Sequence, residues 1–186
     1  MSIQNSAVII GVGPERGLGA TLAKHFAAQG LHIYIAGRSK EKLQHVADRI
    51  RENGGSISLV VADATQWCDI NHLFDVIRSE HTALQLAVYN VDSNIPLPIL
   101  ETQEEIFTQL WQQNCLGAFL FAKEVIGCMQ PNKQGTLIFT GATASMRAKP
   151  PFTAFASAKA ALRSLAQGLA REFSPEGIHV VHAIID

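Results

Sequence analysis

The chain has 186 residues, of which 47% are hydrophobic and 17% charged, with a formal net charge of −1. This composition is typical of a globular domain and excludes a disordered, collagen-like or disulfide-rich chain. The small net charge predicts no nucleic-acid or anionic-membrane binding. The sequence contains no run of about 18 apolar residues, so we predict no membrane span.

Apolar segments of strand length alternate with segments of helical period along the whole chain. The expected strands cover residues 7–12, 32–37, 56–63, 84–90, 135–140 and 177–185. The expected helices cover residues 17–29, 40–53, 67–80, 104–129 and 152–173. This alternation predicts an α/β fold, a Rossmann-like doubly wound parallel sheet with right-handed crossovers and helices on both faces.

A glycine-rich turn, GVGPERGLG at residues 11–19, joins the first expected strand to the first expected helix. Glycine permits positive φ and close backbone approach, and the N-terminus of a helix offers free N–H groups to a pyrophosphate. Because the turn lies within the first βαβ unit, it predicts nucleotide binding. A purely structural turn is the alternative.

The spacing of the glycines at 13, 17 and 19 resembles that of the short-chain dehydrogenase/reductase family, and the resemblance covers essentially the whole chain. Further matches follow in the family's order at Asp63, Asn90, Asn114 and Lys159. The resemblance implies one NAD(P)-binding domain over residues 1–186, without the family's C-terminal substrate-binding segment. The cofactor-binding residues that it implies are Gly13, Arg16, Gly17, Leu18, Gly19, Arg38, Asp63, Ala64, Asn90 and Lys159.

Two arginines favour NADP(H) over NAD(H). In NAD-preferring members an acidic residue follows the second strand and binds the ribose 2′-hydroxyl, whereas this chain has Gly37 followed by Arg38. A guanidinium binds a 2′-phosphate well, and Arg16 matches a second basic position of NADP-preferring members. The alternative is that both arginines are solvated loop charges.

The expected active site departs from that of the family. The family's catalytic tyrosine lies four residues before the lysine, where this chain has Phe155, whose ring has no proton to donate. Losing a positioned acid removes roughly 10²–10⁴-fold of rate. The usual serine position is Ala142, and the nearest hydroxyls are those of Thr143 and Ser145. The expected catalytic residues are Lys159, Asn114, Thr143 and Ser145.

Three functions therefore stay open. The first is an NADP(H)-dependent oxidoreductase that acts on a carbonyl, an alcohol or a related small substrate and has an altered proton donor. The second is a weak or inactive NADP(H)-binding pseudoenzyme that serves as a sensor or scaffold. The third is an interaction subunit in which the glycine turn is a relic.

Other side chains carry weaker predictions. His179 and His182 lie three apart on an expected strand and face opposite sides, so no metal site is expected. Asp92 replaces a small residue near the cofactor, and we interpret it as a loop cap rather than a base. The cysteines do not form a CxxC motif and fit reduced thiols of a cytoplasmic protein; they are Cys68, Cys115 and Cys128.

The family's pairing of helices across a two-fold axis implies a homodimer or homotetramer. The helical aromatic residues would contribute to that interface, or else all belong to the core; they are Phe107, Trp111, Phe119 and Phe121.

Overall fold

The computed structural model describes residues 4–185, and its six parallel strands form one sheet in the order β3-β2-β1-β4-β5-β6. The strands are β1 (Asn5–Ile10), β2 (His32–Gly37), β3 (Ile57–Val61), β4 (Ala83–Tyr89), β5 (Gly135–Gly141) and β6 (Ile178–Ile184). The helices are α1 (Leu18–Ala28), α2 (Lys40–Glu52), α3 (Trp67–Ser79), α4 (Glu104–Trp111), α5 (Gly117–Met129) and α6 (Thr153–Phe173). The predicted Rossmann-like fold is confirmed.

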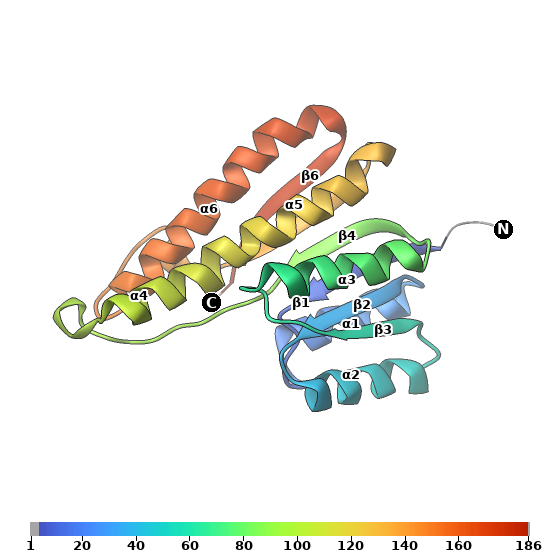
Figure 1. The fold of residues 1–186 in the computed structure, drawn as a ribbon, viewed down its shortest axis with the longest axis horizontal. Coiled ribbons are helices and arrows are strands. Elements are labelled where there is room, and N and C mark those ends of the chain that lie inside the picture. Colours follow the sequence, from blue (N-terminus) through green and yellow to red (C-terminus); the bar gives the residue numbers. More distant parts are fainter. Residues whose placement is uncertain (1–3, 186) are drawn as a thin grey trace.

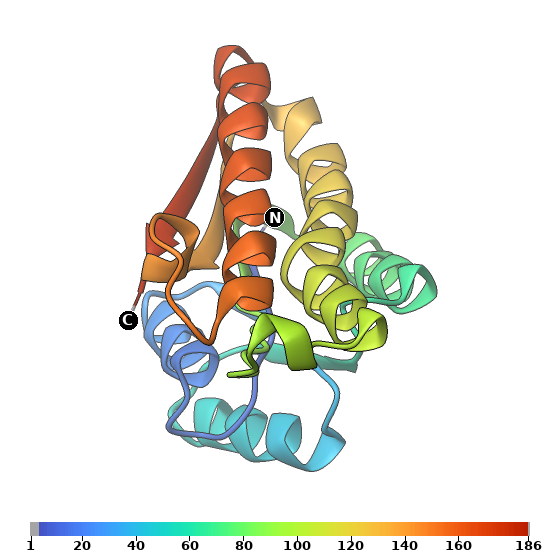
Figure 2. The ribbon, with the colours of Figure 1, turned by 90° about the vertical axis from the view of Figure 1, so that its left-hand side faces the viewer.

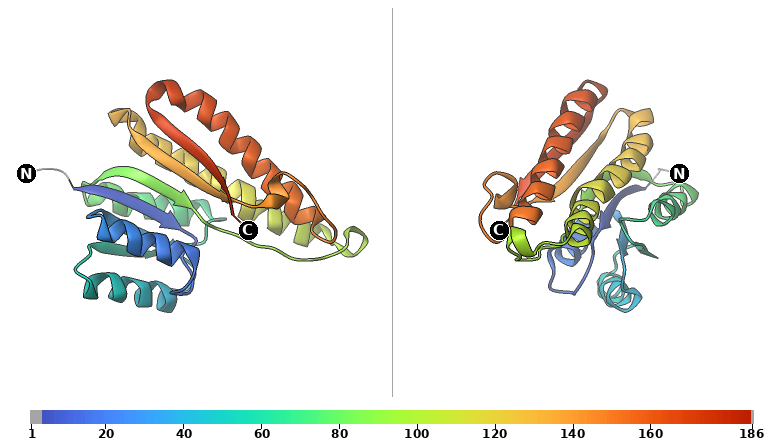
Figure 3. Two further views of the ribbon diagram at one scale, coloured as in Figure 1. Left: turned by 180° about the vertical axis from the view of Figure 1, so that it is seen from behind. Right: turned by 60° about the vertical axis from the view of Figure 1, so that its left-hand side comes forward.

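Two apolar layers hold the helices on opposite faces of the sheet (Figures 1 and 3). On one face, α1 and α2 pack on β1 and β2 through small and branched side chains such as Ala20, Ala23 and Val46. On the other face, α3, α5 and α6 cover the sheet around Phe74 and Phe121. Burial of side chains of this size is the main favourable contribution to folding. Among the described residues, no helix combines the length and the apolarity that a membrane span requires.

The expected helical stretch over 104–129 is confirmed, and a π-helical turn, Gln112–Leu116, lies within it between α4 and α5. The buried Tyr89 hydroxyl donates a hydrogen bond of 2.6 Å to the Gln113 carbonyl, which a regular α-helix would pair with residue 117. A Cβ on Gly117 would also clash with Tyr89 and Ala64, so this segment packs closely against the end of β4. Turns of this kind are frequent at functional sites.

The chain reverses its winding direction between the adjacent strands β1 and β4. Figure 2 shows α5 and α6 side by side above α1 and α2, which belong to the two halves of the sheet. One crossover leads from β1 toward β2 and β3, and the other half of the sheet extends through β5 and β6. In doubly wound sheets, ligands bind outside the carboxyl ends of the strands at such a point. The fold therefore directs attention to the loops that follow Ile10 and Tyr89.

Candidate active site

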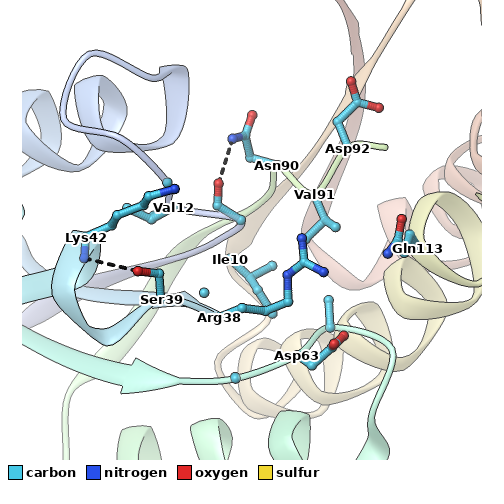
Figure 4. A pocket seen from close by; sticks show the side chains of 15 residues that line it. Ile10, Val12, Arg38, Ser39, Lys42, Asp63, Asn90, Val91, Asp92 and Gln113 are labelled. Atoms are coloured by element: carbon cyan, nitrogen blue, oxygen red, sulfur yellow. Dashed lines mark hydrogen bonds between the residues drawn. The ribbon is translucent and has the colours of Figure 1, made fainter. Parts of the chain in front are cut away.

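A cavity of about 420 Å³ lies at the carboxyl ends of β1 to β4. Figure 4 shows Ser39 and Lys42 at one end of it and Asp92 and Gln113 at the other. The lining residues come from the loops after four strands and from the π-helical turn; they are Ile10, Gly11, Val12, Gly13, Gly37, Arg38, Ser39, Lys42, Ala62, Asp63, Ala64, Asn90, Val91, Asp92 and Gln113.

The glycine turn is fixed against the loop after β4. Gly11 has φ +88°, and a Cβ there would lie 2.5 Å from the Asn90 carbonyl, so only glycine fits. The Asn90 side chain donates a hydrogen bond of 3.1 Å to the Gly11 carbonyl and also lies close to Gly19. Gly13 differs from both, because it lines the cavity and a Cβ on it would meet no described atom within 4 Å.

Helix α1 begins directly behind this turn, with Gly17 as its N-cap and Leu18 as its exposed first residue. Its first turn holds no acidic residue, and Glu15 just before it forms ion pairs with Lys24 (3.9 Å) and Arg49 (3.5 Å). The N–H groups and positive dipole end of α1 are therefore available to an anion.

Arg38 extends across the cavity, and its guanidinium lies between Asp63 and Val91 (Figure 4). By contrast, Arg16 is exposed on the glycine turn and does not line the cavity. Lys42, which the sequence analysis missed, also lines the cavity, and its side chain lies near Val12 (Figure 4). Lys42 could have been predicted from the sequence, because it lies in the first turn of α2, directly after the loop that follows β2.

Two further residues shape this end of the cavity. A Cβ on Gly37 would lie 2.5 Å from the Val12 carbonyl, so the glycine turn itself requires a residue without a side chain here. Asp63 lies two residues after the end of β3 and accepts hydrogen bonds from the backbone N–H (2.9 Å) and hydroxyl (2.8 Å) of Thr65. Its carboxylate is thereby held at the cavity wall, next to Ala64.

Lys159 is 1% exposed on α6, and its ammonium forms an ion pair of 3.1 Å with the Asp92 carboxylate. It also donates a hydrogen bond of 3.2 Å to the Thr140 carbonyl. Burial lowers the pKa of Lys159, while the Asp92 charge opposes that change. The interpretation of Asp92 as a loop cap did not include this contact, in which its carboxylate reaches a buried cation.

A second cavity of about 460 Å³ adjoins the first and shares Asp92 with it. It is lined by residues of the loops after β4 and β5 and of the start of α6; they are Asp92, Asn94, Ala142, Thr143, Ala144, Arg147, Lys149, Phe152, Phe155 and Ile185. Thr143 thus faces this cavity, whereas the Ser145 hydroxyl donates to the Ala142 carbonyl at 2.6 Å within its own turn.

Asn114 lies on the π-helical turn and is fully buried. Its amide donates to the carbonyls of Ser93 (3.0 Å) and Leu110 (2.9 Å), which ties the turn to the loop that carries Asp92. The Asn114 Oδ1 atom is buried without a partner among the described residues. Such an orphaned acceptor marks a place for an ordered water or a ligand group.

The histidines and carboxylates do not gather into a metal centre within residues 4–185, where no three potential ligands lie together. His179 is exposed, whereas His182 packs against Gly141. Burial and the nearby charges of Arg163 and Lys159 lower the pKa of His182.

Comparison with known proteins agrees with this geometry. The family model for short chain dehydrogenases matches residues 6–184. The chain belongs to the short-chain dehydrogenase family. Members of this family are oxidoreductases that bind a nicotinamide cofactor.

Individual relatives differ in how closely they resemble this short-chain dehydrogenase. A crystal structure of a family member from Rhodopseudomonas palustris is 38% identical, covers 98% of this chain and 84% of its own, and superposes with a TM-score of 0.93. An oxidoreductase of Sarocladium schorii is 24% identical over 90% of this chain and 66% of its own length. A metagenomic short-chain oxidoreductase in complex with NADP, 21% identical over 97% of this chain and 81% of its own, has a TM-score of 0.91.

Proposed function

We propose that this short-chain dehydrogenase binds NADP(H) in the cavity at the carboxyl ends of β1 to β4 and interconverts an alcohol and a carbonyl compound. The observation that carries the proposal is the open space over Gly13 at the N-terminus of α1, with Arg38 at the same cavity. The side chain missing at Gly13 leaves room for a pyrophosphate, and the helix terminus supplies N–H donors. When bound, the dinucleotide supplies the hydride donor or acceptor.

Preference for the 2′-phosphate rests on cationic side chains at the adenosine end of the cavity. Arg38 and Lys42 both line it, and Gly37 contributes no carboxylate that would repel a phosphate. A guanidinium forms paired, charge-assisted hydrogen bonds with phosphate oxygens. Two structural relatives, a polyketide ketoreductase and the metagenomic enzyme, are described with NADPH or NADP.

Arg38→Gln tests this preference. We expect the Kd for NADPH to rise about 10- to 150-fold, because a hydrogen bond to a charged group contributes about 1.5–3 kcal/mol. The Kd for NADH should change less than about threefold, since its ribose carries no phosphate. Calorimetric titration gives both constants. The matched control is Arg171→Gln in the exposed last turn of α6, and equal losses for the two dinucleotides would contradict the assignment.

We further propose that Phe155 occupies the family's tyrosine position, so that proton transfer uses another group. Phe155 is 5% exposed on α6, and its ring centroid lies 5.7 Å from the Lys159 ammonium. The chain thus keeps the family's lysine, but the neighbouring side chain lacks the phenol hydroxyl of the family's tyrosine. The Lys159 ammonium is held in place by Asp92 and the Thr140 carbonyl, and this ordered lysine supports an enzyme over a pseudoenzyme that only binds nucleotide.

We propose that the protein forms a homodimer through α4 and α5. Phe107, Trp111 and Phe119 are 40%, 39% and 47% exposed on these helices, whereas Phe121 is fully buried. Exposed aromatic side chains of this kind dominate many interfaces. Phe119→Glu should raise the dimer dissociation constant by about 100-fold in light-scattering chromatography, while Val61→Glu at the opposite sheet edge should not. A wild-type monomer would contradict the proposal.

We place the protein in the cytoplasm. Cys68, Cys115 and Cys128 are free thiols in the structure. Unpaired cysteines are typical of reducing compartments, where disulfides are rare.

A further inference from the structure

Asp92 stands at the junction of the two cavities. It follows β4 on the loop that begins at Asn90, and its side chain is 56% exposed. Figure 4 shows it at the end of the first cavity that lies away from Ser39 and Lys42. A small molecule in the second cavity would therefore meet this carboxylate at the place where the first cavity opens toward it.

The Asp92 carboxylate is held from behind by a fixed cation. Lys159 contacts it at 3.1 Å and is itself anchored to the Thr140 carbonyl at 3.2 Å. Lys159 does not line either cavity, so the group presented to a bound molecule is the carboxylate and not the ammonium. Phe155 lines the second cavity but offers only a hydrocarbon ring.

The remaining lining residues of the second cavity leave few groups that can accept a proton at neutral pH. Arg147 and Lys149 are cations, and Phe152 is apolar. Asp63 is the other carboxylate at the first cavity, but it is bonded to Thr65 on the wall formed by the loop after β3. Within the described lining, Asp92 is the carboxylate that faces both cavities.

We propose that Asp92, oriented by Lys159, is the proton acceptor for a secondary alcohol bound in the second cavity, an inference that rests on the proposed function. The hydroxyl proton passes to Asp92 Oδ as the carbon–oxygen bond becomes a carbonyl. The carbinol C–H bond breaks, and its electron pair leaves as hydride to the oxidant, an oxidised nicotinamide dinucleotide. The products are a ketone, the reduced dinucleotide and a protonated Asp92, which returns its proton to water.

A carboxylate suits this direction of reaction. As the hydride leaves, positive charge develops at the alcohol oxygen, and its proton becomes acidic enough for a weak base to accept. The proposed role of Asp92 is therefore tested with alcohols as substrates.

Asp92→Asn tests the inference, because an amide can still bond to Lys159 but cannot accept the proton. The probes are cyclohexanol, 2-butanol and 3-hydroxybutyrate with NADP⁺; the last is included because Arg147 and Lys149 line the cavity. We expect kcat to fall about 10²–10⁴-fold, with Asp92→Glu recovering part of the loss. The matched control is Asp48→Asn, which removes an exposed ion pair with Arg51 on α2.

Two further measurements do not depend on turnover. Calorimetry should give Asp92→Asn an NADPH affinity within about threefold of the wild type. NMR of the Lys159 ammonium should show a lower pKa in Asp92→Asn, because the carboxylate that raises it is gone. An unchanged kcat, an unchanged Lys159 pKa, or a wild type that binds NADPH but oxidises none of the probes would overturn the role of Asp92. Failure of the wild type to bind NADPH would instead refute the proposed function itself.

Discussion

Gly13→Val is expected to abolish dinucleotide binding while the fold keeps its stability. Gly13 lines the cavity, does not have positive φ, and has open space where a side chain would project. The added side chain would fill the volume that we assign to the pyrophosphate. We expect the Kd for NADPH to rise at least about 100-fold, equivalent to about 2.7 kcal/mol.

Gly30→Ala is the matched control for this substitution. Gly30 also has open space around it, but its φ of +86° disfavours any side chain, and it follows α1 at the other end from the cavity. That substitution should cost roughly 1–3 kcal/mol of unfolding free energy and leave NADPH affinity unchanged. Urea denaturation and calorimetry measure the two effects separately. If Gly13→Val bound NADPH normally, the pyrophosphate would not lie over this turn.

Lys159→Met should lower turnover of the alcohol probes about 10²–10⁴-fold without lowering stability. Lys159 is almost completely buried, whereas its partner Asp92 is more than half exposed and can be hydrated alone. Replacing a buried charge by an apolar side chain of similar size is often neutral or stabilising. Steady-state kinetics should therefore show the loss of turnover, while denaturation should show an unfolding free energy that does not fall.

Lys123→Met provides the comparison for the loss of a lysine. Its ammonium lies 5.6 Å from the Trp67 ring centroid on the α3–α5 side of the molecule, away from both cavities. Turnover should be unchanged. A Lys159→Met protein that kept full turnover, or that unfolded where Lys123→Met did not, would show that Lys159 has a structural role alone.

The fold could be predicted because its signal is local and repeated. Buried parallel strands favour largely apolar runs, and such runs alternate with amphipathic helices along this sequence. Element ends were less predictable: β1 ends at Ile10 because Gly11 turns the chain with φ +88°. The π-helical turn between α4 and α5 depends on the Tyr89 hydrogen bond to Gln113, a tertiary contact that helical periodicity does not encode.

Site residues divide in the same way. Motif spacing predicts Asp63, Asn90 and Lys159; the first two line the first cavity, and Lys159 is buried behind Asp92. The ion pair between Asp92 and Lys159 was missed, because it forms only when the loop after β4 meets the buried face of α6. Sequence distance does not reveal that approach. Arg16, which motif spacing predicts as a second basic residue for the cofactor, is exposed on the glycine turn, whereas Lys42, which spacing did not indicate, lines the cavity.

The measurement that tests the account most directly is a calorimetric titration of the wild-type protein with NADPH and then with NADH. One site for each chain, with NADPH bound at least about tenfold more tightly than NADH, is the predicted result. This preference is expected if Gly13 and the N-terminus of α1 bind the pyrophosphate while Arg38 binds the 2′-phosphate of the same molecule. Binding of neither dinucleotide by the folded protein, or tighter binding of NADH, would contradict the account.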